Sequence, residues 1–369
     1  MDSGGGEAAR EIPAVRALSF HANYRCENTG VCCSSGWEIA VEMDVEVRLT
    51  ALLAGAPGHL PNGPDGFRLM ADPPTRCESS LRKLDSTGAC WFRDDPGRAC
   101  AIHRNHGEAV LPSACRQFPK VCVLEPGVVS VSLSHYCPTA AGLLFGPPTD
   151  FRLVSDPGAF PGDWPFEGLD ARDAYPPFLR PGVLLGFDGL RTFEDQAVAV
   201  LAGEALGRAL AILESAVEGV RSWTMEAGPL CELMPGAFAR AAREATQAKT
   251  QPRATDPRAV LLSAVTAGTT PNAELPDFRA ASTTVSALAD LALRKYLASR
   301  LIAAWIAFQG DDLRQVVRYL RLCLDTVLLF ESARSPAESD AIRWKEAIRS
   351  TDLWILHHCD PELLARNLR

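Results

Sequence analysis

Apolar residues recur at every third or fourth position through most of the second half of the chain, with charged residues between them. That spacing brings the apolar side chains onto one face of a helix. Thr192, with Asp195 three residues later, and Asp311 stand where helix N-caps are expected. The pattern predicts helices over residues 192–203, 204–223, 287–308, 311–330 and 335–356.

The first 145 residues show shorter and more mixed patterns. Period-two alternation is typical of a strand, whereas Pro at the start of an apolar run favours a first helical turn. Hydrophobic periodicity is weak between Cys77 and Cys115, so that segment is expected to need something other than a core to hold it. The patterns predict a strand over 36–42, a helix over 43–55, a hairpin over 121–133 and a helix over 137–145.

These elements predict a mainly α fold, in which an irregular, metal-organised α/β cysteine module precedes an α-helical domain. Pro, Gly and Asp are frequent in residues 146–182, which is typical of a connection between domains, although the aromatic residues there suggest that it packs on something. We therefore expect four parts: a flexible N-terminus over 1–19, the cysteine module over 20–145, a linker over 146–182 and the helical domain over 183–369.

Charge and hydropathy exclude some classes of function. The net charge of -8 argues against a nucleic-acid partner, because such proteins need clustered Lys and Arg to displace counterions. The most apolar runs are interrupted by charges and are too short to span a bilayer. The N-terminal stretch has neither the basic nor the apolar region of a secretory signal, so a cytoplasmic location is expected.

Nine of the 12 cysteines lie between Cys26 and Cys137. In a reducing compartment such cysteines are not expected to be structural disulfides. Thiolates bind zinc ions and iron–sulfur clusters, and a bound metal can fold a segment that lacks its own core. A cysteine-rich scaffold without metal is the alternative. Cys32 and Cys33 are adjacent, and we expect them to point to different places because neighbouring residues rarely bind one ion without backbone strain.

The cysteine spacing differs from the repeated C-x2-C of a zinc ribbon. The segments YRCENTGVCCSSGWEI, CWFRDDPGRACAIHRNHGEAVLPSACRQFPK and SHYCPTAA resemble the cysteine-cluster family described as zinc- or iron-chelating, and within it the flagellin lysine N-methylases. The residues that match are Cys26, Gly30, Cys32, Cys33, Cys90, Cys100, Ile102, His103, Cys115, Arg116, Phe118 and Pro119, with Cys137 and Pro138 typical of the methylase branch.

The resemblance implies a protein-lysine N-methyltransferase that uses S-adenosylmethionine and acts on flagellin or another lysine-bearing protein. An alternative is a non-enzymatic zinc- or iron-chelating protein or an iron–sulfur protein. No strand leads into a glycine-rich turn of the kind that binds a nucleotide-like donor, so the sequence names no catalytic residue. The candidate ligands of a zinc ion or an iron–sulfur cluster are Cys26, Cys32, Cys33, Cys90, Cys100, Cys115 and Cys137.

One departure from the family pattern concerns Thr29, which stands where the general family has a second cysteine. The first motif alone therefore cannot supply four thiolates, and Cys77 and Cys122 are candidates to replace the missing one. His103 has a spacing at which histidine can bind a metal, but the family tolerates Tyr there, so a hydrogen-bonding role is expected. Arg116 is expected either to neutralise thiolates or to form a surface ion pair.

Overall fold

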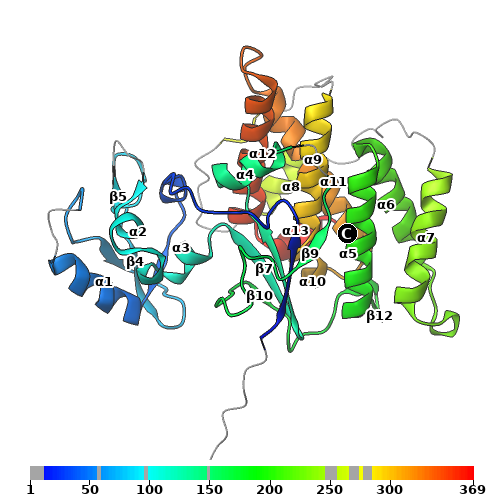
Figure 1. Ribbon diagram of the computed structural model, residues 1–369, viewed down its shortest axis with the longest axis horizontal. Helices are drawn as coiled ribbons and strands as arrows, with labels where there is room; N and C mark the ends of the chain where they lie inside the picture. The colour runs from blue at the N-terminus through cyan, green and yellow to red at the C-terminus, as the bar shows by residue number, and fades with distance from the viewer. Residues whose placement is uncertain are drawn as a thin grey trace, which may run out of the picture.

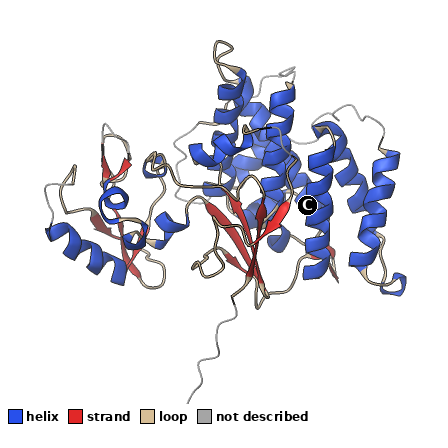
Figure 2. Cartoon of the chain, viewed as in Figure 1, coloured by secondary structure: helices blue, strands red, loops and turns tan. Residues whose placement is uncertain are grey.

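The computed structural model describes residues 12–55, 60–94, 99–147, 150–245, 256–265, 274–276 and 285–369. A small lobe lies at one end of the molecule, and a larger body of strands and helices makes up the rest (Figure 1). Helices predominate, yet a group of strands stands at the centre of the body (Figure 2). The fold is therefore mixed α/β with a large helical share.

The body is built around a five-stranded sheet with the strand order β10-β7-β8-β1-β9. β1 runs parallel to β8 and antiparallel to β9, and β7 and β8 form an antiparallel pair. This pair confirms the hairpin predicted over 121–133. The strands are β1 Ala14–Leu18, β7 Lys120–Glu125, β8 Val128–Leu133, β9 Leu153–Ser155 and β10 Leu169–Asp170.

β1 lies inside the segment 1–19 that the sequence predicts to be flexible, and the prediction is wrong for residues 14–18. Val15 and Ala17 have no solvent exposure, because their side chains pack in a hydrophobic core on one face of the sheet. A five-residue strand shows too few alternations to be recognised next to a glycine-rich start. Residues 1–11 of the predicted flexible segment lie outside the described residues.

The small lobe is formed by the chain between β1 and β7, in which α1 packs against the three-stranded sheet β2-β4-β3. Val45, Leu49 and Leu53 of α1 lie on one helical face and are buried in a small hydrophobic core with Phe92 and Ile102. The lobe therefore has a core of its own, which the weak periodicity did not predict. Its elements are η1 Cys32–Ser34, β2 Ala40–Glu42, α1 Met43–Gly55, β3 Phe67–Leu69, β4 Cys77–Leu81, β5 Arg93–Asp94, β6 Ala99–Cys100, α2 Ala101–His106, η3 Glu108–Val110 and α3 Ser113–Gln117.

The Pro- and Gly-rich segment 146–182 is part of the body and does not separate two domains. It supplies the edge strands β9 and β10, and Phe160 is fully buried against one face of the sheet with Cys122 and Val131. The expectation that its aromatic residues pack on something is confirmed. The hairpin β7–β8 also belongs to the body, so the boundary of the cysteine module expected at 145 lies too late in the chain.

Helices cover the sheet and form the largest hydrophobic core of the molecule. α9 packs against β8, and the Ser132 hydroxyl donates a hydrogen bond of 2.5 Å to the Ser299 carbonyl. No helix in the described part of the chain is both long and apolar enough to cross a membrane. The body helices are α4 Pro138–Leu144, α5 Phe187–Gly203, α6 Leu206–Arg221, α7 Leu230–Glu244, α8 Pro257–Ser263, α9 Ala287–Leu301, α10 Ile306–Gln309, α11 Leu313–Ser332, α12 Asp340–His357 and α13 Pro361–Asn367.

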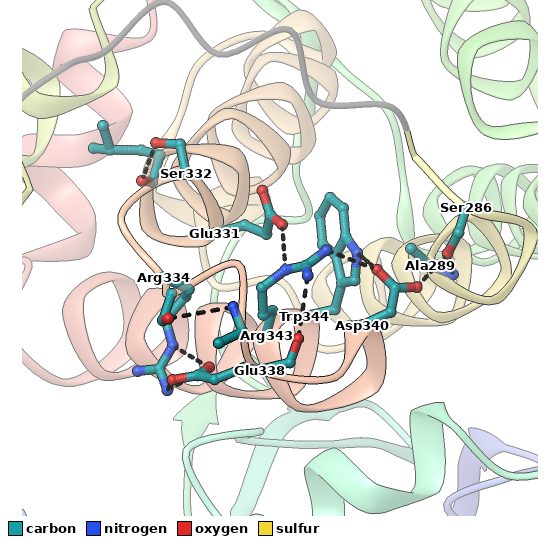
Figure 3. Close-up of polar contacts among 12 residues, drawn as sticks. Ser286, Ala289, Glu331, Ser332, Arg334, Glu338, Asp340, Arg343 and Trp344 are labelled. Atoms are coloured by element: carbon teal, nitrogen blue, oxygen red, sulfur yellow. Dashed lines mark hydrogen bonds and ion pairs between the residues drawn. The ribbon is translucent and has the colours of Figure 1, made fainter.

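Polar contacts fix the start of α12 against α9 and α11 (Figure 3). Asp340, in the first turn of α12, accepts hydrogen bonds from Ser286 at 2.5 Å and from the buried Trp344 indole at 3.0 Å. Arg343 forms ion pairs with Asp340 at 3.1 Å and with Glu331 of α11 at 3.0 Å. These contacts place α12, whose other end reaches the lobe.

Candidate metal centre

Five of the predicted ligands lie together in the small lobe, although they come from well-separated parts of the chain. The Cys33 thiol hydrogen-bonds with the thiols of Cys32, Cys90 and Cys100. Cys115 lies close enough to this set for its charge to interact with theirs. We call Cys32, Cys33, Cys90, Cys100 and Cys115 the thiol group. The adjacent Cys32 and Cys33 both belong to it, so the expectation that they point to different places is wrong.

Backbone hydrogen bonds hold the CENTGVCC segment in the conformation that brings these thiols together. Gly30 has a φ of 67°, a left-handed conformation that costs glycine least, and its carbonyl accepts a 3.1 Å hydrogen bond from the Cys33 amide. The Cys33 carbonyl in turn accepts a 2.7 Å bond from the Cys90 amide. Asn28 accepts a 3.4 Å bond from the Cys100 amide through its side chain. One tight turn therefore anchors two other cysteine-bearing segments.

The thiol group is electrostatically asymmetric. Hydrogen bonds with the other thiols, that with Cys100 foremost, raise the pKa of Cys33. The hydrogen bond from Cys33 lowers the pKa of Cys100 to about 7 and also lowers that of Cys32. Burial raises the pKa of Cys115 well above its ordinary value. Cys100 and Cys32 thus lose their protons first, and thiolates are the form that binds metals.

Lys83 and Arg104 are basic side chains of the lobe whose charges interact with Cys90 and Cys100 of this group. The Lys83 ammonium donates a hydrogen bond to the Gly36 carbonyl, and burial lowers its pKa. The Arg116 Nε is buried and has no hydrogen-bond partner among the described residues. Arg116 forms no surface ion pair with the residues that the structure describes, and neutralisation of thiolates by Arg116 stays a prediction.

Cys26 and Cys137 lie beside the thiol group and are joined through Tyr24. The Tyr24 hydroxyl is 3.8 Å from the Cys137 sulfur, and Tyr24 also hydrogen-bonds with the Cys26 side chain. Burial raises the pKa of Cys26, and the nearby Cys32 and Cys137 raise it further. The structure therefore brings these two predicted ligands near the others but does not place them in the hydrogen-bonded set around Cys33.

The candidates to replace the missing cysteine at Thr29 do not join the thiol group. Cys122 is fully buried in β7 within the core of the body. Cys77 begins β4, where Glu42 is the neighbouring charge. The backbone amide of His103 donates a 3.5 Å hydrogen bond to the Cys100 sulfur, so its contact with the site comes from the main chain.

A cavity of about 50 Å³ lies beside the thiol group. Most of its wall is apolar, and Lys83 is its basic residue. No motif identified Lys83, because it stands alone in an irregular segment. Among the residues around the cavity are Cys32, Cys33, Cys90, Cys115, Trp37 and Phe118.

The cavity adjoins the contact between the lobe and the body. Trp37 stacks on His357 of α12, with ring centroids 4.3 Å apart, and Phe118 and Tyr136 complete this aromatic cluster. His357 Nε2 lies 2.8 Å from the Ser134 hydroxyl. Trp37 belongs to the CCSSGW motif, but sequence could not identify His357, which is more than 300 residues away.

The donor atoms suit a thiophilic metal, since sulfur ligands select zinc, iron–sulfur clusters and other soft ions. In the part of the chain that the structure describes, no three His, Cys, Asp or Glu side chains are arranged to hold an ion as they stand. Binding needs the thiolate form, so an ion would displace the remaining thiol protons of its ligands.

Comparisons of the chain with family models, with curated proteins and with solved structures give no significant match.

Proposed function

We propose that the protein binds a zinc ion or an iron–sulfur cluster through the thiol group. The observation that carries the proposal is the convergence of Cys32, Cys90 and Cys100 on Cys33. Three half-buried thiols around a fourth form a dense set of soft donors, which suits a thiophilic ion. Cys26 and Cys137 are proposed as neighbours of the centre that do not bind the metal.

The basic side chains around the thiol group support this proposal. Four thiolates around a divalent ion leave a net negative charge, which a buried site must balance. Lys83 and Arg104 are positive groups of the lobe whose charges interact with Cys90 and Cys100 respectively. Their charges would offset part of the negative charge of the loaded centre.

Elemental analysis of protein purified without oxygen tests the proposal. We expect zinc or iron near stoichiometric amounts, with visible absorption if an iron–sulfur cluster is present. Cys33→Ser should lose most of the metal, because its thiol contacts three others. Cys231→Ser changes a half-buried cysteine of α7 and should retain it. Folded wild-type protein that neither carries nor takes up zinc or iron would contradict the proposal.

Protein-lysine N-methylation is a second candidate, and we propose it on the resemblance to flagellin lysine N-methylases. The favouring observation is that Cys32, Cys33, Cys90, Cys100 and Cys115, which carry the resemblance, occupy one site. In this role the centre would hold the lobe in the conformation that binds the methyl donor or the protein substrate. S-adenosylmethionine would be the donor, and flagellin or another lysine-bearing protein the acceptor.

Labelled S-adenosylmethionine tests the second candidate. Incubation with metal-loaded protein and a lysate of the source organism should label one or a few proteins on lysine. Cys33→Ser should abolish the labelling, and Cys231→Ser should not. Absence of label from every protein under anaerobic, metal-replete conditions would leave metal binding as the function.

A further inference from the structure

Two cysteines of the thiol group, Cys33 and Cys90, are placed to react with one another. Their thiols hydrogen-bond with each other. Their main chains are joined as well, because the Cys33 carbonyl accepts a 2.7 Å hydrogen bond from the Cys90 amide. Both cysteines are free and half-buried. A covalent bond between the two sulfurs therefore needs little movement of the main chain.

The backbone spacing of this pair suits a disulfide. Residues that share such a hydrogen bond in paired strands have Cα atoms roughly 5.5 Å apart. A disulfide spans Cα separations of about 4.4–6.8 Å, so that spacing lies inside the range. Cys90 also forms an antiparallel bridge with Lys83, which holds its main chain from another side. Cys32 is a poorer partner for Cys33, because the Cα atoms of adjacent residues are only about 3.8 Å apart.

The cavity beside the thiol group gives a small oxidant a route to this pair. Cys33 and Cys90 both line the cavity, whereas Cys100, which also contacts Cys33, does not. Ala114 lines it too and is exposed, so the cavity reaches the surface of the lobe. A water molecule needs roughly 10–15 Å³ of such a cavity, so a volume of about 50 Å³ admits hydrogen peroxide.

We propose that Cys33 and Cys90 are a redox pair, and that peroxide joins them in a reversible disulfide that disables the metal centre. One sulfur attacks the O–O bond of the peroxide, becomes a sulfenic acid and releases water. The thiol of the other cysteine then displaces a second water from the sulfenic sulfur, and the S–S bond forms. The two sulfurs lose two electrons in total, which reduce the peroxide to water. A thiol reductant reverses the change by thiol–disulfide exchange.

The consequence of the disulfide rests on the proposed metal binding, whereas its chemistry does not. The disulfide removes two donors at once, because the thiolate is the form of cysteine that binds metals. Cys33 is also the residue whose thiol contacts both Cys32 and Cys100, so the remaining donors lose their common neighbour. The lobe therefore binds metal when it is reduced and releases it when it is oxidised.

Oxidation of the reduced, metal-free protein by hydrogen peroxide tests the pairing. Tryptic digestion without reductant should give a linked peptide of residues 26–48 and 84–93, and fragmentation should place the bond between Cys33 and Cys90. Dithiothreitol should separate the two peptides. Cys231→Ser, a change at a half-buried cysteine of α7, is the matched control and should react as the wild type does. A bond to another cysteine, or sulfonic acids without a disulfide, would overturn the pairing.

Cys100→Ser separates this pair from the other contacts of Cys33. The variant retains both members of the pair and should still form the disulfide. Failure of the folded variant to form it would overturn the assignment of Cys90 as the partner that reacts.

Zinc uptake tests the switch separately from the pairing. The reduced wild type should retain zinc through a desalting step, the oxidised protein should lose most of this capacity, and dithiothreitol should restore it. Equal zinc uptake before and after the disulfide forms would overturn the switch. A reduced protein that forms the disulfide but binds neither zinc nor iron would contradict the proposed metal binding and with it the switch, while the redox pair would stand.

Discussion

Cys33 is the central residue of the thiol group, because its thiol hydrogen-bonds with those of Cys32, Cys90 and Cys100. Sequence motifs named all of these residues, since cysteine is rare enough for its spacing to be informative. They could not separate Cys26 and Cys137 from the group, because the difference depends on Tyr24, which lies between those two side chains. Lys83 and His357 were missed because a single Lys or His has no pattern around it.

The ligand set can be tested one cysteine at a time. Cys90→Ser should lower the metal content of anaerobically purified protein severalfold, because Cys90 is in contact with Cys33. Cys26→Ser and Cys137→Ser should change it little, because neither side chain is among those in contact with the Cys33 thiol. Metal analysis of the three variants, normalised to folded protein, measures the difference. Equal loss in all three would mean that the centre extends to Cys26 and Cys137.

His357 should make stability depend on pH. Burial lowers its pKa from 6.5 to about 4 in the folded protein. The folded state therefore favours the neutral ring. The contribution of His357 to the free energy of unfolding is complete above pH 6.5 and is lost as the pH falls through about 4. Because the ring keeps some exposure, we expect about 2 kcal/mol rather than the full shift.

Urea unfolding of the wild type and of His357→Gln between pH 7 and 4 measures this contribution. The free energy of unfolding should fall less steeply in the variant. Burial also lowers the pKa of His21 and His135, so part of the acid sensitivity should remain. If the free energy of unfolding fell equally with pH in both proteins, His357 would have the same pKa in the folded and unfolded states.

At the scale of elements, strong periodicity predicted α5, α6, α9, α11 and α12, but their ends follow contacts that the pattern does not contain. α5 begins at Phe187, so Thr192 lies inside it and donates to the Asp188 carbonyl instead of capping the helix. The cap of α11 is Asp312, one residue after the predicted Asp311. α7 was missed because Pro235 interrupts it, and tertiary packing of its apolar face outweighs that local cost.

The start of α12 depends on Asp340. Asp340→Ala should lower the free energy of unfolding by about 2 kcal/mol, because it leaves the buried Trp344 indole and Arg343 without this partner. Denaturant unfolding at neutral pH measures the change. Glu362→Gln weakens an exposed pair with Arg366 and should cost less than about 0.5 kcal/mol. Similar losses in both variants would contradict the special role of Asp340.

At the scale of the whole molecule, the lobe and the body meet at the stacked pair Trp37 and His357. The sequence could not predict this arrangement, because the strand pairing that builds the body is non-local. β1 pairs with β8, and the whole lobe lies between them in sequence. The sequence therefore suggested two consecutive domains, a cysteine-rich one and a helical one. In the structure β1, which precedes the lobe in the chain, is a strand of the body sheet.

Trp37→Ala should loosen the lobe on the body. Loss of the stacked ring removes a buried aromatic contact, so brief digestion with a protease should cut faster in the segments that join β1 and β7 to the lobe. Trp91→Ala is the matched control, since Trp91 hydrogen-bonds to Gly63 inside the lobe. Mass spectrometry of the fragments locates the cuts. Identical patterns in the wild type and in Trp37→Ala would show that other contacts hold the lobe.

The two points at which the chain leaves and rejoins the sheet lie close together. Ala17 of β1 and Cys122 of β7 flank the same residue of β8, Val131, and so lie roughly 10 Å apart, two strand spacings. About four flexible residues could bridge that gap. In genetic terms the lobe has the form of an insertion. A single insertion between the codons of β1 and those of β7 would be enough to add it to an existing body. Its length and cysteine content can then diverge among descendants without changing the order of the strands around it.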